Sequence, residues 1–337
     1  MRIGIDAMGG DYAPREVVRG ALEALPALDG HQLVLVGNEG VVSRELEHCG
    51  PPDGQVTIVH TSQVIGMNEG PVEAVRQKKD SSISRLAEMA AAHELDAIIS
   101  AGNTGAFAAA SQLRMKLLPG VSRPGVAVVI PSFMGPIALC DAGANIVPKP
   151  HHLVQYAVMT AAYVRTVLKV NRPRVALLSV GGEDLKGTTL VKQAHELLRS
   201  CGRVNFVGNV EGRDLFRGGC DVVICDGFVG NIALKLTEGL AEGLFKTISK
   251  EVALASPESA RSFEPVVKRV WANHNYAEYG GAPLLGVDGT CIICHGSSGH
   301  VAIRNAVRVA TEYLEQDLNS IIAAELVEEP GTRRPSQ

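Results

Sequence analysis

Short apolar runs alternate with longer runs of helical composition along almost the whole chain. The short runs are rich in Val and Ile, which is typical of buried strands, and the longer runs have the length of helices. Strands are predicted at residues 2–6, 32–36, 56–59, 96–100, 125–130, 137–141, 174–179, 203–207, 221–225 and 290–294. Helices are predicted at residues 14–27, 41–49, 81–93, 104–118, 150–168, 188–200, 231–249 and 298–318. This alternation predicts βαβ crossovers and a mostly parallel sheet between helical layers, an α/β fold.

The alternation continues to about residue 320, and we expect residues 1–320 to form one domain. Residues 249–279 depart from the rhythm, because they contain two prolines, several charges and the only Trp of the chain. We interpret them as an insertion that contacts a partner or a membrane. Residues 321–337 are expected to form a polar C-terminal tail.

The composition narrows the class of protein. Of the 337 residues, 46% are apolar and only 4% aromatic, which suits buried strands covered by helices of small residues. A net charge of −4 argues against a nucleic-acid partner. The seven cysteines lie mostly in apolar runs, as reduced thiols of a cytoplasmic protein would. We expect no secretory signal and no membrane span, while peripheral association with the inner face of a membrane stays open.

Four of the predicted strands end in loops of Gly, Asn, Asp and Ser. These strand–loop units cover residues 3–11, 97–105, 222–231 and 291–299. A Gly-rich turn at a helix N-terminus presents unpaired backbone N–H groups, which bind anions. In a parallel sheet such turns lie along one edge, so we expect them to converge on one anionic ligand, with phosphate as the first candidate.

Two of these loops have side chains suited to phosphate. Gly102 and Gly105 permit a close backbone approach, and Asn103 and Thr104 add polar groups; the alternative is an ordinary N-cap. The second loop offers an imidazole and two hydroxyls, from His295, Ser297 and Ser298, and its alternative is a plain turn.

Two further residues are candidates for the chemistry. Asn231 stands at the N-terminal end of a predicted helix, where its amide could donate to an oxyanion, although this motif taken alone favours an N-cap role. Lys186 lies in a loop between glycines and could neutralise phosphate, although a solvated surface Lys is the default interpretation. The remaining polar loop residues are expected to support the site by capping backbone or orienting basic groups: Asp6, Asp11, Asp141, Asn145 and Asp226.

Several familiar sites are excluded. The sequence 291–295 has the spacing of a c-type haem attachment, but that needs an exported chain, and alternation would place Cys291 and Cys294 on opposite faces of a strand. No second Cys/His pair stands at zinc-ligand spacing, so no metal site is predicted. The motifs of dinucleotide-binding proteins, P-loop NTPases, serine hydrolases and zinc proteases are missing from the sequence.

Taken together, the loops resemble a family, the phosphate acyltransferases of bacterial phospholipid synthesis, over residues 1 to about 318. The resemblance rests on six segments: Ile5-Asp-Ala-Met-Gly-Gly-Asp11, Ser100-Ala-Gly-Asn-Thr-Gly105, Asp141-Ala-Gly-Ala-Asn145, Gly208-Asn-Val-Glu-Gly-Arg213, Cys225-Asp-Gly-Phe-Val-Gly-Asn231 and Glu278-Tyr-Gly-Gly-Ala-Pro-Leu-Leu-Gly286. It implies a three-layer α/β/α sandwich like that of isocitrate and isopropylmalate dehydrogenases, and a homodimer.

The resemblance also implies an activity: transfer of a long-chain acyl group from acyl carrier protein to inorganic phosphate, without an organic cofactor. The acyl phosphate would then serve a membrane glycerol-3-phosphate acyltransferase. In this scheme Gly102, Asn103, Thr104, Gly105, Ser297 and Ser298 bind phosphate. Lys186 neutralises charge, Asn231 donates to the oxyanion, and His295 carries a proton to the leaving sulfur.

The chain departs from the family pattern at two places. Residues 179–183 read Ser-Val-Gly-Gly-Glu, and the insertion has few large apolar residues before Phe263, which weakens membrane docking through it. Lys268 and Arg269 remain candidates for contacting the acidic carrier protein. Three alternatives stand beside this function: a phosphotransacetylase-like enzyme that uses acyl-CoA, a hydroxy-acid dehydrogenase of the same broad fold, and a non-catalytic scaffold of lipid synthesis.

Overall fold

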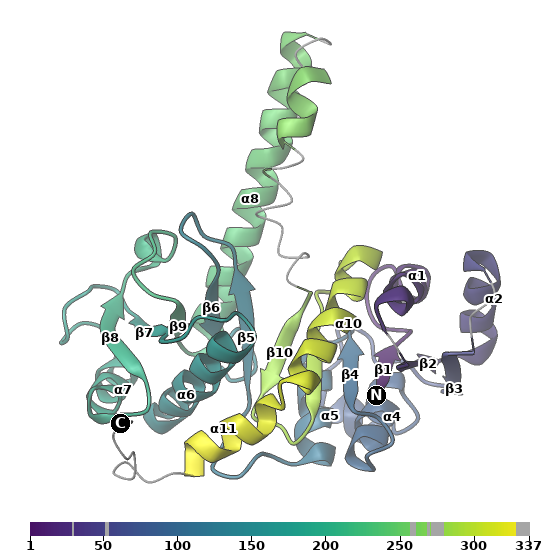
Figure 1. Ribbon diagram of the computed structural model, residues 1–337, viewed down its shortest axis with the longest axis horizontal. Helices are drawn as coiled ribbons and strands as arrows, with labels where there is room; N and C mark the ends of the chain where they lie inside the picture. The colour runs from purple at the N-terminus through teal and green to yellow at the C-terminus, as the bar shows by residue number, and fades with distance from the viewer. Residues whose placement is uncertain (29, 51–53, 257–260, 268–269, 271–279, 328–337) are drawn as a thin grey trace.

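A computed structural model describes the whole chain except residues 29, 51–53, 257–260, 268–269, 271–279 and 328–337. Its described strands form one sheet of 11 strands in the order β3-β2-β1-β4-β11-β10-β5-β6-β9-β7-β8 (Figure 1). The strands are β1 Arg2–Asp6, β2 Gln32–Gly37, β3 Val56–His60, β4 Ala97–Ser100, β5 Gly125–Ile130, β6 Ile137–Cys140, β7 Arg174–Leu178, β8 Asn205–Val210, β9 Val222–Ile224, β10 Ala282–Leu285 and β11 Thr290–Ile293.

Helices connect most of these strands, and polar side chains fix where several of them begin. The helices are α1 Arg15–Ala24, α2 Glu39–Cys49, α3 Pro71–Gln77, α4 Ser82–Ala91, α5 Thr104–Met115, α6 Pro150–Thr166, α7 Thr189–Ser200, α8 Gly227–Ala255, α10 His300–Glu315 and α11 Leu318–Val327, with short 3₁₀ turns at Leu25–Ala27 and Gly212–Asp214. The side chains of Asn38, Ser81, Asn103, Thr188 and Asp226 accept hydrogen bonds from the first turns of α2, α4, α5, α7 and α8.

The sheet is mostly parallel, as predicted. Among the described strands, every pairing is parallel except those of β10 with β11, β10 with β5, and β5 with β6. The pattern of apolar residues did not predict β10, because it has only four residues and contains Pro283. Its ends are set by Gly281 and Gly286, whose φ values of 94° and 95° fit glycine.

Helices cover both faces of the sheet, which confirms the α/β/α sandwich. Around β1, β2, β4 and β11, α1 and α10 bury one face with residues such as Val18 and Ile303, while α4 and α5 bury the other with Leu86 and Phe107. Cys291 and Cys294 belong to opposite faces, as alternation predicted. Around β6, β7 and β9, α6, α7 and α11 cover one face, and the base of α8 packs on the other.

Helix α8 differs from its predicted bounds at both ends. It begins at Gly227 because Asp226 caps it, and it runs 29 residues to Ala255, so it enters the segment that we expected to be a separate insertion at 249. Beyond its base it projects away from the rest of the molecule, and the helical residues 261–267 run back beside it (Figure 1). Lys268 and Arg269 lie outside the described residues. None of the described helices, α8 included, combines the length and hydropathy that crossing a membrane requires.

The C-terminus also differs from the expected boundary. Residues 321–327, expected to start a polar tail, belong to α11, and Ile322 of that helix is fully buried in the core that α6 helps to form. The single long helix predicted for 298–318 is two helices, separated at Asp317 with φ 46°. The rest of the predicted tail, from 328 on, lies outside the described residues.

Candidate active site

The loops that follow β1, β4 and β11 contact one another. The backbone N–H of Asp11 donates to the carbonyl of Gly296 at 2.7 Å, joining the first loop to the third. A Cβ on Gly9 would lie 2.6 Å from the backbone nitrogen of Gly102, so the first and second loops touch backbone to backbone. Three of the predicted anion-binding loops therefore form one assembly.

A buried carboxylate stabilises these loops through hydrogen bonds. Asp6, 1% exposed, accepts hydrogen bonds from the Ser100 hydroxyl at 2.7 Å and from the backbone N–H of Met8 at 3.1 Å. Burial raises the pKa of Asp6, and its hydrogen bonds oppose that rise. Ser100 in turn accepts from the backbone N–H of Gly102 at 3.0 Å. That N–H already has a partner within the loop, so the phosphate role predicted for Gly102 is not favoured.

Asn103 is also engaged by the protein itself. Its Nδ2 donates to the carbonyls of Gly66, Met67 and Glu69 at 3.1, 3.3 and 3.1 Å. Its Oδ1 accepts from the N–H of Ala106 at 3.0 Å, as the N-cap of α5. The side chain has no spare group for phosphate, so the phosphate role predicted for Asn103 is not favoured.

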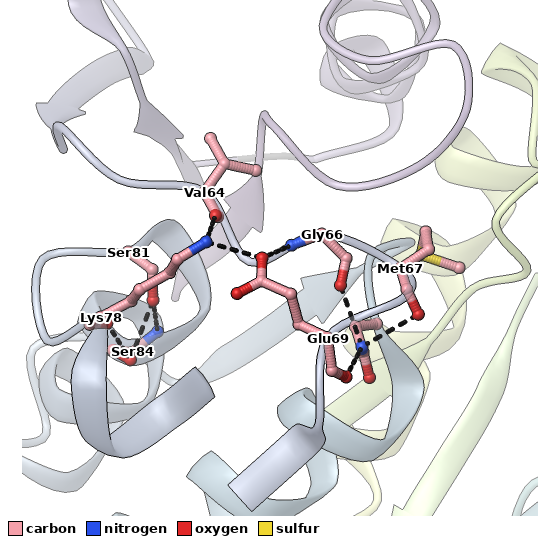
Figure 2. Close-up of polar contacts among 8 residues, drawn as sticks. Val64, Gly66, Met67, Glu69, Lys78, Ser81 and Ser84 are labelled. Atoms are coloured by element: carbon pink, nitrogen blue, oxygen red, sulfur yellow. Dashed lines mark hydrogen bonds and ion pairs between the residues drawn. The ribbon is translucent and has the colours of Figure 1, made fainter. Parts of the chain in front are cut away.

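Figure 2 shows how the 64–69 loop is held in place for Asn103. Glu69 pairs with the ammonium of Lys78 at 2.6 Å and accepts from the N–H of Gly66 at 2.6 Å. Lys78 also donates to the carbonyl of Val64 at 2.8 Å. The first turn of α5 is therefore fixed from outside by a loop that the sequence did not single out.

On the other side of the site, Asp141 organises the loop after β6. Its carboxylate accepts from the backbone N–H groups of Val126, Gly143, Ala144 and Asn145 and from the Asn145 amide, at 2.6 to 3.2 Å. Burial raises the pKa of Asp141, and these bonds oppose it. The support role predicted for Asp141, Asn145 and Asp226 agrees with this geometry.

The start of α8 lies directly on this loop. The N–H of Gly227 donates to the carbonyl of Asn145 at 2.8 Å, and a Cβ on Gly230 would lie 2.0 Å from the carbonyl oxygen of Asp141. Glycine at 230 is thus required for the close approach. The next residue, Asn231, lines a cavity together with residues that follow β4 and β11.

A cavity of about 280 Å³ lies where the loops of the two halves meet. It is lined by Thr104 and Gly105 from the first turn of α5, Asn231 from α8, His295 after β11 and Gly143 after β6. The loops after β6 and β11 both reach it, although these two strands run in opposite directions in the sheet. Four residues predicted for the site therefore share one cavity.

Asn231 contributes an exposed side-chain amide to this cavity. Its side chain is exposed, it lies beside Gly143, and no described residue hydrogen-bonds to its amide. Thr104 and Gly105 belong to the N-terminal end of α5, so this helix end faces the cavity, and a helix N-terminus favours negative charge. An amide donor opposite a helix N-terminus can bind an anion and stabilise a developing oxyanion.

His295 is oriented by its own loop. The N–H of Ser297 donates to His295 Nδ1 at 3.2 Å, and the Ser297 hydroxyl lies 2.7 Å from the same nitrogen. Partial burial lowers the pKa of His295, the nearby Lys235 lowers it further, and the carboxylates of Glu238 and Asp11 oppose this. Burial and Lys235 thus favour the uncharged imidazole, whose Nδ1 accepts from Ser297, and the proton-carrier role of His295 stays a prediction.

The other end of that loop is closed to an external anion. Ser298 is 8% exposed and is not favoured as a phosphate ligand, because it lines neither the 280 Å³ cavity nor its neighbour, a cavity of about 890 Å³ along α8. The N-terminus of α10 is occupied by the chain's own carboxylate, because Glu16 accepts from the N–H of His300 at 2.9 Å and from its ring at 2.8 Å. Both hydrogen bonds lower the pKa of Glu16.

The structure distinguishes between two lysines. Lys186, predicted to neutralise phosphate, is exposed on the loop after β7 and lines neither the 280 Å³ cavity nor its neighbour. Lys235, which sequence reasoning missed, lines both and pairs with Glu238 at 3.0 Å. The signal that could have found it is its spacing, since a residue four positions after Asn231 lies on the same helix face. In the described part of the chain, no three His, Cys, Asp or Glu side chains form a cluster that could hold a metal.

Solved structures share this architecture. A phosphotransacetylase from Streptococcus pyogenes matches with a TM-score of 0.63 at 15% identity, covering 94% of each chain. The EutD phosphotransacetylase from Staphylococcus aureus matches with a TM-score of 0.59 at 14% identity, covering 93% of this chain and 94% of that one. The fold is thus that of the phosphotransacetylases.

Sequence comparison is more specific. The model of a family described as fatty acid synthesis protein matches residues 1–321. A phosphate acyltransferase from Halothermothrix orenii is 46% identical over 97% of this chain and 98% of the relative, and one from Pelotomaculum thermopropionicum is 48% identical over 94% and 93%. The chain belongs to this family, the phosphate acyltransferases, which are acyltransferase enzymes.

Proposed function

We propose that this acyltransferase moves a long-chain fatty acyl group from the thioester of an acyl carrier protein to inorganic phosphate. A phosphate oxygen attacks the thioester carbonyl carbon, a C–O bond forms and the C–S bond breaks. The products are the acyl phosphate and the carrier's thiol, whose sulfur takes the proton released by the attacking hydrogen phosphate. Phosphate is itself a nucleophile and a thiolate leaves readily, so the protein's task is to position the reactants and stabilise the oxyanion.

The observation that carries the proposal is the cavity shared by the first turn of α5, Asn231 and His295. Thr104 and Gly105 hold phosphate at the helix N-terminus, and Lys235 supplies positive charge. Asn231 donates to the oxyanion of the tetrahedral intermediate. The uncharged His295 hydrogen-bonds to phosphate or to the leaving sulfur. Lys186 remains a second candidate for the cation.

The nearest alternative is a phosphotransacetylase-like enzyme, and the fold resemblance favours this alternative. The two functions differ in the acyl donor, which is acyl carrier protein in the proposed function and acyl-CoA in the alternative. The test compares acyl phosphate formation from palmitoyl-carrier protein and from palmitoyl-CoA at equal concentrations. We expect turnover with the carrier protein only. Turnover with CoA alone would move the chain to the alternative class, and turnover with neither would favour a non-catalytic scaffold.

The same assay separates the two lysines. Because Lys235 lines the cavity, we expect Lys235→Ala to lower kcat/KM for phosphate by about tenfold, an energetic loss typical of one charge-assisted hydrogen bond. Lys186→Ala is the matched control and is expected to have a smaller effect. A larger loss in Lys186→Ala would assign the cation to the 181–187 loop and contradict our choice of Lys235.

We also propose a homodimer in the cytoplasm, whose product passes to a membrane glycerol-3-phosphate acyltransferase. Leu236, Leu240 and Leu244, 68%, 66% and 53% exposed, form an apolar stripe on α8 directed away from the cavity. A second copy of α8 would cover such a stripe.

Substitution Leu240→Lys tests this interface. It places a charge in the middle of the stripe, so we expect the dimer to dissociate to monomers in analytical ultracentrifugation at the concentration where the wild type sediments as a dimer. Leu113→Lys, at a 57% exposed leucine of α5, is the matched control and should leave the dimer intact. Equal sedimentation of all three proteins would rule out this stripe as the interface.

A further inference from the structure

The cavity at Asn231 continues into a larger one along α8. The second cavity has a volume of about 890 Å³, and the two share Val129, Leu234, Lys235, Glu238 and His295 as lining residues. The two cavities are therefore adjacent, and together they extend from Asn231 along the helix as a groove. The larger cavity alone is within the size range of sites that enclose small ligands, roughly 300–1,000 Å³.

The lining of this groove is set by one face of α8. Asn231, Leu234, Glu238, Ala241 and Phe245 succeed one another at intervals of three or four residues, which places them in a row on a helix. The row lies opposite the leucine stripe, so α8 has one face for the groove and another for a partner.

The opposite wall is apolar as well. It includes Val129 and Ile130 at the end of β5, the adjacent Pro131, and Val267 from the helical segment beside α8, with Tyr12, His295 and Ser297 completing the lining outside α8. Charged groups such as Glu242 and Lys246 also line the groove. A groove with mostly apolar walls and a few charged groups favours a hydrocarbon chain as its ligand. A ligand that carries amide groups would lose hydrogen bonds to water in this groove, and the walls would not replace all of them.

The groove also has the right length. From Asn231 to Phe245 the helix rises 14 residues, about 21 Å at 1.5 Å per residue. A fully extended saturated chain advances about 1.25 Å per carbon, given C–C bonds of ~1.5 Å. The groove therefore accommodates a chain of roughly 16 carbons.

We propose that this groove binds the hydrocarbon chain of the acyl substrate, with its carbonyl at Asn231, and that Ala241 and Phe245 set the chain length. The inference rests on the proposed acyl transfer and adds where the chain lies and what limits it. Ala241 lies 10 residues beyond Asn231, about 15 Å along the helix. A bulky side chain there obstructs the distal part of a palmitoyl chain and leaves an octanoyl chain untouched.

The experiment compares Ala241→Phe with Ala253→Phe, a matched change at an exposed alanine of α8 that lines neither cavity. Acyl phosphate formation is measured with palmitoyl and octanoyl thioesters of the same carrier. We expect Ala241→Phe to lower kcat/KM for the palmitoyl donor by on the order of 10²-fold, the effect of expelling the roughly four carbons that lie beyond Ala241, with the octanoyl donor and Ala253→Phe unchanged. Equal loss with both donors, or no loss, overturns the proposal.

A binding measurement keeps this test independent of catalysis. Hexadecylphosphonate and octylphosphonate are titrated into each full-length protein by calorimetry. Each buried methylene adds up to about fourfold in affinity, so the wild type should bind the longer probe much more tightly, and Ala241→Phe should lose much of that difference. If the wild type makes acyl phosphate but shows no chain-length preference in either assay, this inference fails while the proposed function stands. If the wild type prefers the longer probe yet transfers no acyl group, the proposed function fails and the groove remains a hydrocarbon site.

Discussion

Replacing Asn231 with alanine is expected to lower kcat for acyl phosphate formation by about 10²–10³-fold, the loss typical of removing one oxyanion donor. The amide lines the cavity between the first turn of α5 and His295, and no described residue hydrogen-bonds to it. Its removal therefore takes a donor from the transition state and breaks no bond of the folded protein. KM for the acyl donor should change little, because the interaction forms only as the carbonyl oxygen becomes charged.

Asn231→Asp is the companion variant. It keeps the size of the side chain but replaces the donor with a negative charge, so it should lose at least as much activity as Asn231→Ala. Thermal unfolding of both variants should match that of the wild type. If Asn231→Ala lowers activity and the melting temperature together, with residual activity restored at low temperature, the role of Asn231 is structural and the oxyanion assignment is wrong.

The largest effect on stability is expected at Asp141. Asp141→Asn should lower the free energy of unfolding by about 3–5 kcal/mol, because one oxygen that accepts backbone N–H groups becomes an NH₂ group facing them. The carboxylate is completely buried and holds Val126, Gly143, Ala144 and Asn145. Since the base of α8 lies on this loop, the change should also misplace Asn231 and reduce activity.

Asp226→Asn is the matched control for this change. Asp226 accepts from the N–H groups of Phe228 and Val229 through Oδ1 alone, and Asn caps helices about as well as Asp. Urea unfolding should therefore show a loss of less than about 0.5 kcal/mol for Asp226→Asn. Similar urea unfolding midpoints for the two variants would show that Asp141 stabilises the protein no more than the N-cap Asp226 does.

Local sequence predicted most of the strands, because each is a run of apolar residues with turn signals at its ends. The prediction failed at β10, where Ala-Pro-Leu-Leu has neither length nor alternation and forms a strand only between β11 and β5. It also misplaced both ends of α8. Asp226 was a readable N-cap signal, but the C-terminal end has no breaker before Pro257 and depends on what the exposed helix contacts.

Local sequence also predicted part of the candidate site. Glycine-rich loops after strands pointed to Thr104, Gly105, Asn231 and His295, which do line one cavity. The same signal could not separate them from Gly102 and Asn103, whose polar groups are taken by Ser100 and by the 66–69 backbone. A polar residue in a loop looks the same whether its partner is a ligand or another part of the chain.

The sequence by itself determined the alternation of strands and helices, the α/β class and the loops that carry the chemistry, because these follow from local periodicity and turn chemistry. Tertiary structure alone decided which polar groups stay open. It buried Asp6 and Asp141, placed Lys235 rather than Lys186 beside the cavity, and set a second cavity along α8 next to the site. These outcomes depend on contacts between segments far apart in the chain, such as Gly230 against Asp141, and no local pattern encodes such contacts.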